Sequence, residues 1–309
     1  MATTAPLTPA SLRGAPKRRR REATIRVIFA GAAAGSLVIS IAIIVTLLAR
    51  AIRWMTSIDQ SWLIGEGWFP RRNEFDILTL LEGSIVISLI AMVVAAPLGL
   101  GAALYLSEYA SPRARRTLKP ILETLAGIPS VVLGFFALTV IQPTIVVGVF
   151  GAQGSSSFLA AGLAVGILIV PLVASVSEDA LYAVPRHLRE AAYGIGARKR
   201  TVAIRVVVPA ATSGIVAALI LGLSRAIGET MVIAIAAGAT GGALRNINPF
   251  DGGQTMTGAI SSLAIGSDQV QGSSYAFDSL FFVGLLLFII TFALNIASER
   301  VVRRIRRVL

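Results

Sequence analysis

Two charged residues lie inside one of the most apolar stretches of the chain. Arg225 and Glu229 are four residues apart within a run from about 212 to 237 that is otherwise uncharged. An arginine at the centre of a bilayer costs at least about 2.5–3.5 kcal/mol, so it usually has an ionic partner or lines a water-filled cavity. A guanidinium offers paired donors and stays protonated, which suits the binding of an oxyanion.

The pair has two interpretations. On one continuous helix, Glu229 would lie one turn from Arg225 on the same face, and the two charges could simply neutralise each other. Two points weigh against this structural pair. Apolar replacements for buried pairs are often neutral or stabilising, and Arg before Glu is the weaker order on a helix. The functional interpretation is that Arg225 binds an anion, while Glu229 lowers the net field so that the anion can leave.

A second pattern lies in a basic segment between two long apolar runs. Glu190, Ala191 and Ala192 are followed by Gly196 and, thirteen residues later, by Pro209. Apolar spacing predicts two short helices within 178–210, the first ending in a glycine-containing bend and the second stopping at Pro209. Small side chains leave a shallow surface there that another protein could approach closely. An ordinary helix lying at the membrane interface is the alternative.

A third candidate lies next to a proline. Pro129 lacks a backbone donor and disfavours helix at Ile128, which predicts a bend or a helix restart at Ser130. The free N–H groups of such a helix could bind an anion, which makes Ser130 a candidate. A simple kink or the entry point of a span is the alternative. The single histidine, His187, lies in the basic segment and is expected to be a surface or interface residue.

The composition indicates a membrane protein. Apolar residues make up 55% of the chain and charged residues 14%, whereas a soluble domain carries nearer a quarter charged residues. The chain has no cysteine, which excludes disulfides, iron–sulfur clusters and thiolate zinc sites, and one histidine excludes a multi-histidine metal site. We therefore expect no metal site.

Six apolar runs are long enough to cross a bilayer, which predicts an all-α protein with six transmembrane helices. The first follows the basic cluster Lys17–Arg21, but it is too long for a signal-peptide core and is expected to be a retained span. The runs lie at about 27–49, 83–106, 125–149, 158–177, 212–237 and 279–298.

The net charge of +12 is distributed unevenly along the chain. With the N-terminus inside, most of the 28 lysines and arginines fall on the cytoplasmic side, as the positive-inside rule requires, and both termini are cytoplasmic. The charge thus reports topology and does not indicate nucleic-acid binding. The predicted organisation is a disordered basic tail (1–24), a first span with its outer loop (25–72), a transmembrane domain (73–300) containing the 178–210 segment, and a basic cytoplasmic tail (301–309).

The basic segment resembles the coupling motif of ABC-importer permeases. The similarity includes Glu190-Ala191-Ala192, Gly196, Pro209 and the upstream residues Leu181 to Arg189. In that family the short helix fits a cleft on a cytoplasmic ATPase subunit, so the resemblance implies that this segment is a coupling elbow. The chain contains no phosphate-binding loop of the Gly-x-x-x-x-Gly-Lys-Ser/Thr type. We therefore expect that it is not an enzyme and binds no cofactor, with ATP and Mg²⁺ held by a separate ATPase.

The residues around the charge pair narrow the resemblance. Gly222 to Met231 is similar to a signature of the phosphate-specific importers, nearer to the PstC type of permease, and Gly127 to Val132 with Gly134 also matches. The resemblance covers about residues 73–307. It implies that Arg225, Glu229 and Thr230, with Ser130 as a weaker candidate, serve phosphate passage.

The resemblance also implies a complex in the cytoplasmic membrane of a bacterium. Its other members would be a homologous second permease, two copies of the ATPase and an extracytoplasmic phosphate-binding protein. Three alternatives remain: an importer for molybdate or sulfate, a signalling subunit that carries no solute, and a passive anion channel. The coupling elbow argues against the channel.

Overall fold

A computed structural model of the 309-residue chain describes residues 16–65, 67–238, 242–265 and 274–306. The chain divides into two units, residues 1–50 and 51–309. The described part of the first is helix α1 (Pro16–Ser57) as far as Arg50, whose apolar side chains are mostly exposed. The basic tail predicted over 1–24 therefore overlaps α1, and its first fifteen residues lie outside the described range.

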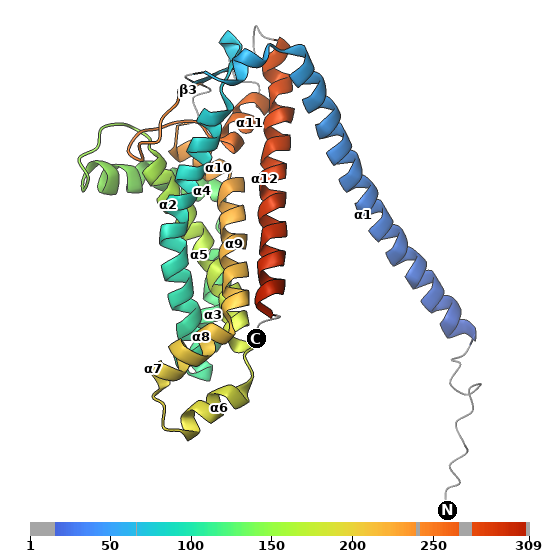
Figure 1. The fold of residues 1–309 in the computed structure, drawn as a ribbon, viewed down its shortest axis with the longest axis vertical. Coiled ribbons are helices and arrows are strands. Elements are labelled where there is room, and N and C mark those ends of the chain that lie inside the picture. The colour runs from blue at the N-terminus through green and yellow to red at the C-terminus, as the bar shows by residue number, and fades with distance from the viewer. Residues whose placement is uncertain (1–15, 66, 239–241, 266–273, 307–309) are drawn as a thin grey trace, which may run out of the picture. The chain divides into compact units, whose positions relative to one another are not determined.

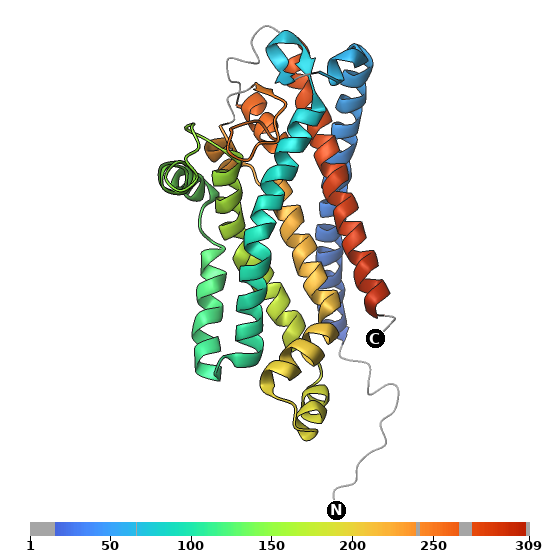
Figure 2. The ribbon, with the colours of Figure 1, turned by 60° about the vertical axis from the view of Figure 1, so that its left-hand side comes forward.

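The second unit is mainly helical, and its long helices run side by side (Figures 1 and 2). Each follows from an apolar run, and several begin with a side-chain cap, such as Asp76 on Leu78 N–H and Ser157 on Ala160 N–H. The elements are η1 (Gln60–Leu63), β1 (Gly67–Phe69), η2 (Pro70–Arg72), β2 (Glu74–Phe75), α2 (Ile77–Leu104), η3 (Tyr105–Tyr109), α3 (Pro112–Leu125), α4 (Ser130–Phe136), η4 (Ala137–Val147), α5 (Phe158–Tyr182), α6 (Arg186–Gly194), α7 (Lys199–Val202), η5 (Ala203–Val207), α8 (Val208–Ala210), α9 (Thr212–Gly228), α10 (Met231–Ala236), β3 (Ala243–Leu244), α11 (Met256–Ala264) and α12 (Ser274–Arg306).

Helix α5 is central to the second unit and packs against both α2 and α9. Small residues allow these helices to approach closely, as is common where lipid gives no hydrophobic drive for helix association. A Cβ atom on Gly162 of α5 would lie 2.6 Å from side-chain atoms of Ile90 on α2. A Cβ atom on Gly222 of α9 would lie 2.9 Å from Val173. Both glycines therefore set the distance between helices.

A small antiparallel sheet, ordered β2-β1-β3, lies at one end of this unit, opposite the coupling elbow (Figure 1). Trp68 and Phe75 on its strands are fully buried and pack with Trp54, whose Nε1 donates a hydrogen bond to the Tyr275 carbonyl at 2.8 Å. The sequence predicted only an outer loop after the first span and no strands. The sheet was missed because its strands are two or three residues long, too short for a periodic pattern.

Five helices in the described residues are long and apolar enough to cross a membrane, and a bent pair makes a sixth if it is one span. The predicted fifth span, 212–237, does not form one helix. Residues Lys199–Ala210 and Thr212–Gly228 meet at an angle of 71°, and the chain leaves helical geometry again at Glu229 before α10. Helix α9 ends at Gly228, a residue that costs more to hold in a helix than alanine does. An apolar run shows that a segment can enter the membrane, but it does not show that its helix is continuous.

The two short helices predicted in the coupling elbow are confirmed, as α6 and the segment beginning with α7. Helix α6 ends at Gly194, and Gly196 follows with a φ of +80°, the left-handed conformation that favours glycine. The second helix ends one residue after the predicted stop at Pro209. Pro209 lies in α8, in the last turn of the helical segment Lys199–Ala210, and the chain turns at Ala211.

Candidate functional site

Arg225 and Glu229 are not a one-turn pair on a common helix face. Glu229 follows the last residue of α9 in extended geometry, with φ −68° and ψ 133°. Its carbonyl accepts a hydrogen bond from Thr257 Oγ1 at 2.7 Å, which fixes the break between α9 and α10 to α11. Glu229 and Thr230 are half-buried, whereas the Arg225 side chain is exposed. Within the described residues, Arg225 and Glu229 form no ion pair with each other.

Arg225 lines a cavity of about 290 Å³ between α3, α5 and α9. The cavity wall combines apolar side chains of α5 with Ser175 and with Glu123, near the end of α3. Glu123 was not among the predicted site residues. A signal was present, because Arg115, Lys119 and Glu123 recur every four residues and so share one face of α3. An arginine, a carboxylate and a hydroxyl thus converge on one apolar-walled space.

The two basic residues on that face of α3 attach the helix to α5. Arg115 pairs with Glu178, whose side chain is fully buried, and Lys119 Nζ lies 2.6 Å from the same carboxylate. Lys119 also lies 2.8 Å from Asp179. Two hydrogen bonds, the more important to Asp179 and the second to Glu178, raise the pKa of Lys119, so its ammonium stays charged throughout the neutral range. These ion pairs hold α3 and hence Glu123 beside α5.

The coupling elbow is anchored by Arg189 of α6. Its Nη2 lies 2.8 Å from Glu108 Oε1, and its guanidinium donates to the carbonyls of Val184 at 2.6 Å and Leu181 at 2.8 Å. The carbonyls at the end of α5 lack partners within the helix, so a cation there is favourable. One side chain therefore joins α6 to both α5 and η3.

The predicted coupling residues differ in exposure. Glu190, Ala191, Gly196 and Pro209 are exposed, but Ala192 is buried at 9% exposure and packs into the elbow. Ala192 therefore does not contribute to an outward surface as the sequence suggested. The outward surface includes instead three large apolar side chains, Leu188, Tyr193 and Ile195, the last of which is 87% exposed.

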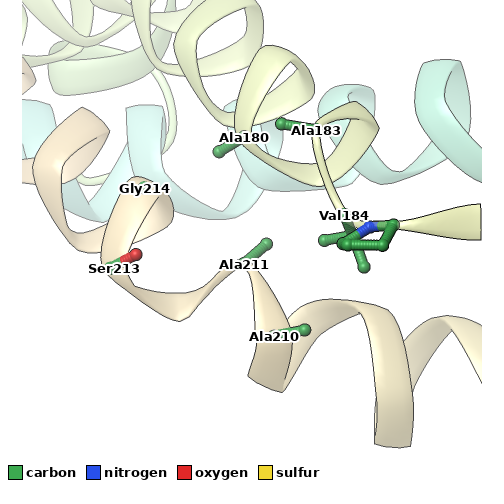
Figure 3. Close-up of a pocket in the computed structure, with 8 residues that line it drawn as sticks. Ala180, Ala183, Val184, Ala210, Ala211, Ser213 and Gly214 are labelled. Atoms are coloured by element: carbon green, nitrogen blue, oxygen red, sulfur yellow. The ribbon is translucent and has the colours of Figure 1, made fainter. Parts of the chain in front are cut away.

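A second cavity of about 280 Å³ lies where α5 ends beside the turn between α8 and α9 (Figure 3). Ala180 of α5 and Ala183 directly after it line one side, and Ala211 of the turn with Ser213 and Gly214 at the start of α9 line the other. Small side chains leave this space next to the elbow. Ser130 begins α4 as predicted and is half-buried, but it is not among the residues that line the Arg225 cavity.

The arrangement of helices is that of the type I permeases of ABC importers. One similar solved structure is a bacterial alginate ABC transporter in complex with a periplasmic protein bound to an alginate pentasaccharide. Its matching chain has a TM-score of 0.63 at 14% identity, over 94% of this chain and 97% of that chain. The MetNI methionine ABC transporter in an inward-facing conformation matches with a TM-score of 0.54 at 20% identity, over 74% of this chain and 94% of that chain.

Residues 95–307 match the model of the binding-protein-dependent transport system inner membrane component, and the chain belongs to this family. It is thus a multi-pass inner-membrane subunit of an ABC transport system, as the resemblance implied. The phosphate transport system permease protein PstC of Mesorhizobium japonicum is 30% identical over 93% of this chain and 95% of its own length. The probable ABC transporter permease YqgH of Bacillus subtilis is 33% identical over 75% of this chain and 74% of its own length.

Proposed function

We propose that this protein is a permease subunit of an ATP-driven importer of inorganic phosphate. The observation that carries the proposal is Arg225, a guanidinium on a membrane helix that faces a cavity and has no ionic partner among the described residues. Such a group favours an oxyanion, because it offers paired donors and cannot be deprotonated. Similarity to phosphate permeases over most of the chain supports phosphate as the oxyanion.

In this proposal the substrate pathway includes Arg225, with Glu229 and Thr230 at the break that follows α9. The break supports the assignment, because irregular backbone at membrane depth is tolerated where it is enclosed by protein or lines a cavity. Ser130 remains a weaker candidate, at the start of α4. No residue of this chain acts catalytically, since translocation makes and breaks no covalent bond.

We also propose that the elbow contacts a cytoplasmic ATPase through α6 and the bend after it. Glu190, Ala191 and Gly196 are exposed there, and Ile195 beside them offers apolar area to a partner. Pro209 would shape the second half of the elbow, and the buried Ala192 would support α6 from beneath. ATP and Mg²⁺ would bind the ATPase, and the N- and C-termini would lie on the same cytoplasmic side.

The complete transporter would contain this chain, a homologous second permease, two ATPase copies and an extracytoplasmic phosphate-binding protein. Transport of another oxyanion such as molybdate or sulfate is the nearest alternative, because the guanidinium alone does not select among tetrahedral anions. A signalling subunit that carries no solute is the alternative from a different class.

The test is ATP-dependent uptake of radiolabelled phosphate by the reconstituted complex, with sulfate and molybdate as competitors. Wild type should take up phosphate, and excess sulfate or molybdate should not compete. Arg225→Gln should stop uptake without disturbing assembly, and Glu190→Ala should leave ATP hydrolysis poorly linked to uptake. Uptake that survives Arg225→Gln unchanged would place the pathway elsewhere, and absence of phosphate uptake by wild type would refute the substrate assignment.

A further inference from the structure

We propose that Glu123 and Arg225 form the two halves of one subsite, which selects a tetrahedral oxyanion that still carries a proton. Arg225 would bind the anionic oxygens, and Glu123 would accept the hydrogen bond of the anion's O–H group. Hydrogen phosphate has such a group, whereas sulfate at neutral pH has none. The inference rests on the proposed function and adds to it a residue that distinguishes between substrates.

The position of Glu123 follows from the attachment of α3 to α5. Along α3, Arg115 and Lys119 contact residues at the end of α5, while Glu123 shares the cavity with residues from Leu168 to Ser175. Rising residue numbers on α3 therefore meet falling numbers on α5, so the helices are antiparallel. Glu123 continues the charged face beyond the paired residues and reaches the level of Arg225.

The two charges facing the cavity are available to a ligand. Glu123 and Arg225 are both exposed, and neither makes an ion pair within the part of the chain that the structure describes. The guanidinium only donates hydrogen bonds, and the ionised carboxylate only accepts them. Ser175 on α5 can do both. The cavity wall thus presents donors from α9 and an acceptor from α3.

This combination distinguishes oxyanions by protonation. Hydrogen phosphate can accept from Arg225 and donate to Glu123, which leaves neither side chain without a partner. Sulfate can satisfy only Arg225, and no hydrogen bond offsets the repulsion between its charge and the Glu123 carboxylate. A site that binds a substrate through its hydroxyl rejects an analogue without that group more strongly than an apolar pocket could, because the acceptor, here Glu123, is left without its hydrogen bond when the analogue binds.

The absence of cysteine from this chain gives a direct test. In the complete transporter, Ala126→Cys places a thiol on the cavity wall, and its labelling by a charged thiol reagent is scored on this chain alone. Phosphate and arsenate, which both keep a proton, should protect the thiol at concentrations at least about tenfold below that required of sulfate. When Glu123→Gln is added to Ala126→Cys, phosphate, arsenate and sulfate should protect the thiol at similar concentrations. Glu299→Gln, on the exposed surface of α12, is the matched control and should leave the difference unchanged.

The inference is overturned if sulfate protects as well as phosphate does, if no anion protects, or if Glu123→Gln leaves the difference intact. Phosphate uptake by the same Ala126→Cys complex separates this failure from failure of the proposed function. Uptake with no effect of Glu123→Gln on anion preference would remove only the subsite. A transporter that takes up no phosphate, with wild type measured in parallel, would remove the proposed function as well.

Discussion

The charges at the elbow end of the second unit and those at the Arg225 cavity are arranged in opposite ways. At the elbow end, Glu178 is buried between Arg115 and Lys119, and Glu108 is paired with Arg189. At the cavity, Arg225 and Glu123 face open space, and neither makes an ion pair with a described residue. Paired charges hold helices in position, whereas unpaired charges remain able to exchange water for a ligand. The comparison separates charges that are paired within the protein from charges that we propose bind the substrate.

The largest effect is expected at the cavity. Arg225→Gln removes the charge-assisted donors and should reduce phosphate uptake by about 100-fold, which corresponds to roughly 3 kcal/mol. Arg225→Lys keeps the charge but not the paired donors, and should retain intermediate uptake. The measurement is initial uptake by proteoliposomes, with complex assembly checked by size-exclusion chromatography. A complex that fails to assemble with either variant would make Arg225 a structural charge and would break the comparison.

The next effect is one of stability. Glu178→Ala leaves Arg115 and Lys119 without their buried partner and should destabilise the protein by about 2–3 kcal/mol. The loss is smaller than that expected for a fully buried ion pair, because both cations are partly exposed. The neighbouring Asp179→Ala removes a 66% exposed carboxylate and should cost less than about 1 kcal/mol. Thermal unfolding in lipid nanodiscs measures both variants. Equal destabilisation by the two would mean that burial does not determine the strength of this network.

A smaller effect is expected where the elbow is anchored. Arg189→Ala removes the contacts from α6 to Glu108 and to the end of α5. A movement of the elbow should then cause a smaller movement of the membrane helices. Phosphate transported per ATP hydrolysed should fall about fivefold, equivalent to roughly 1 kcal/mol. Arg189→Lys keeps the pair with Glu108 but not the planar guanidinium, and should lose less. An unchanged ratio in Arg189→Ala would show that the anchor is not needed for coupling.

The smallest effect concerns the backbone of the elbow. Gly196 has a φ of +80° with open space around it, so Gly196→Ala should cost about 1 kcal/mol through strain alone. Gly194→Ala, in helical conformation and equally uncrowded, should be neutral or slightly stabilising. Comparison of the two unfolding temperatures tests this difference. Equal values would indicate that the bend relaxes freely and is not fixed by Gly196.

Much of the elbow was predictable because its signals are local. Pro185 directly before α6, Gly194 at its end and Gly196 after it act through their own backbone geometry, so the two helices and the bend follow from the residues of this segment alone. The predicted stop at Pro209 lies one residue before the observed end at Ala210, because proline disfavours further helix without fixing the exact last residue. The burial of Ala192 was not predicted, because a short amphipathic pattern does not indicate which side packs inward.

The sequence by itself determined the membrane class, the approximate positions of the apolar helices and the family. These properties depend on composition, on apolar runs of about 20 residues and on local motifs, and each can be recognised in the sequence without knowing which segments are in contact. It could also identify Arg225 as an unusual charge. Only the tertiary structure decided what faces Arg225. Glu123 lies about a hundred positions earlier in the chain, and it shares the cavity because α3 is held against α5 by Glu178. Arg225 is left without Glu229 as a partner one turn away, because Glu229 follows the end of α9 in extended geometry.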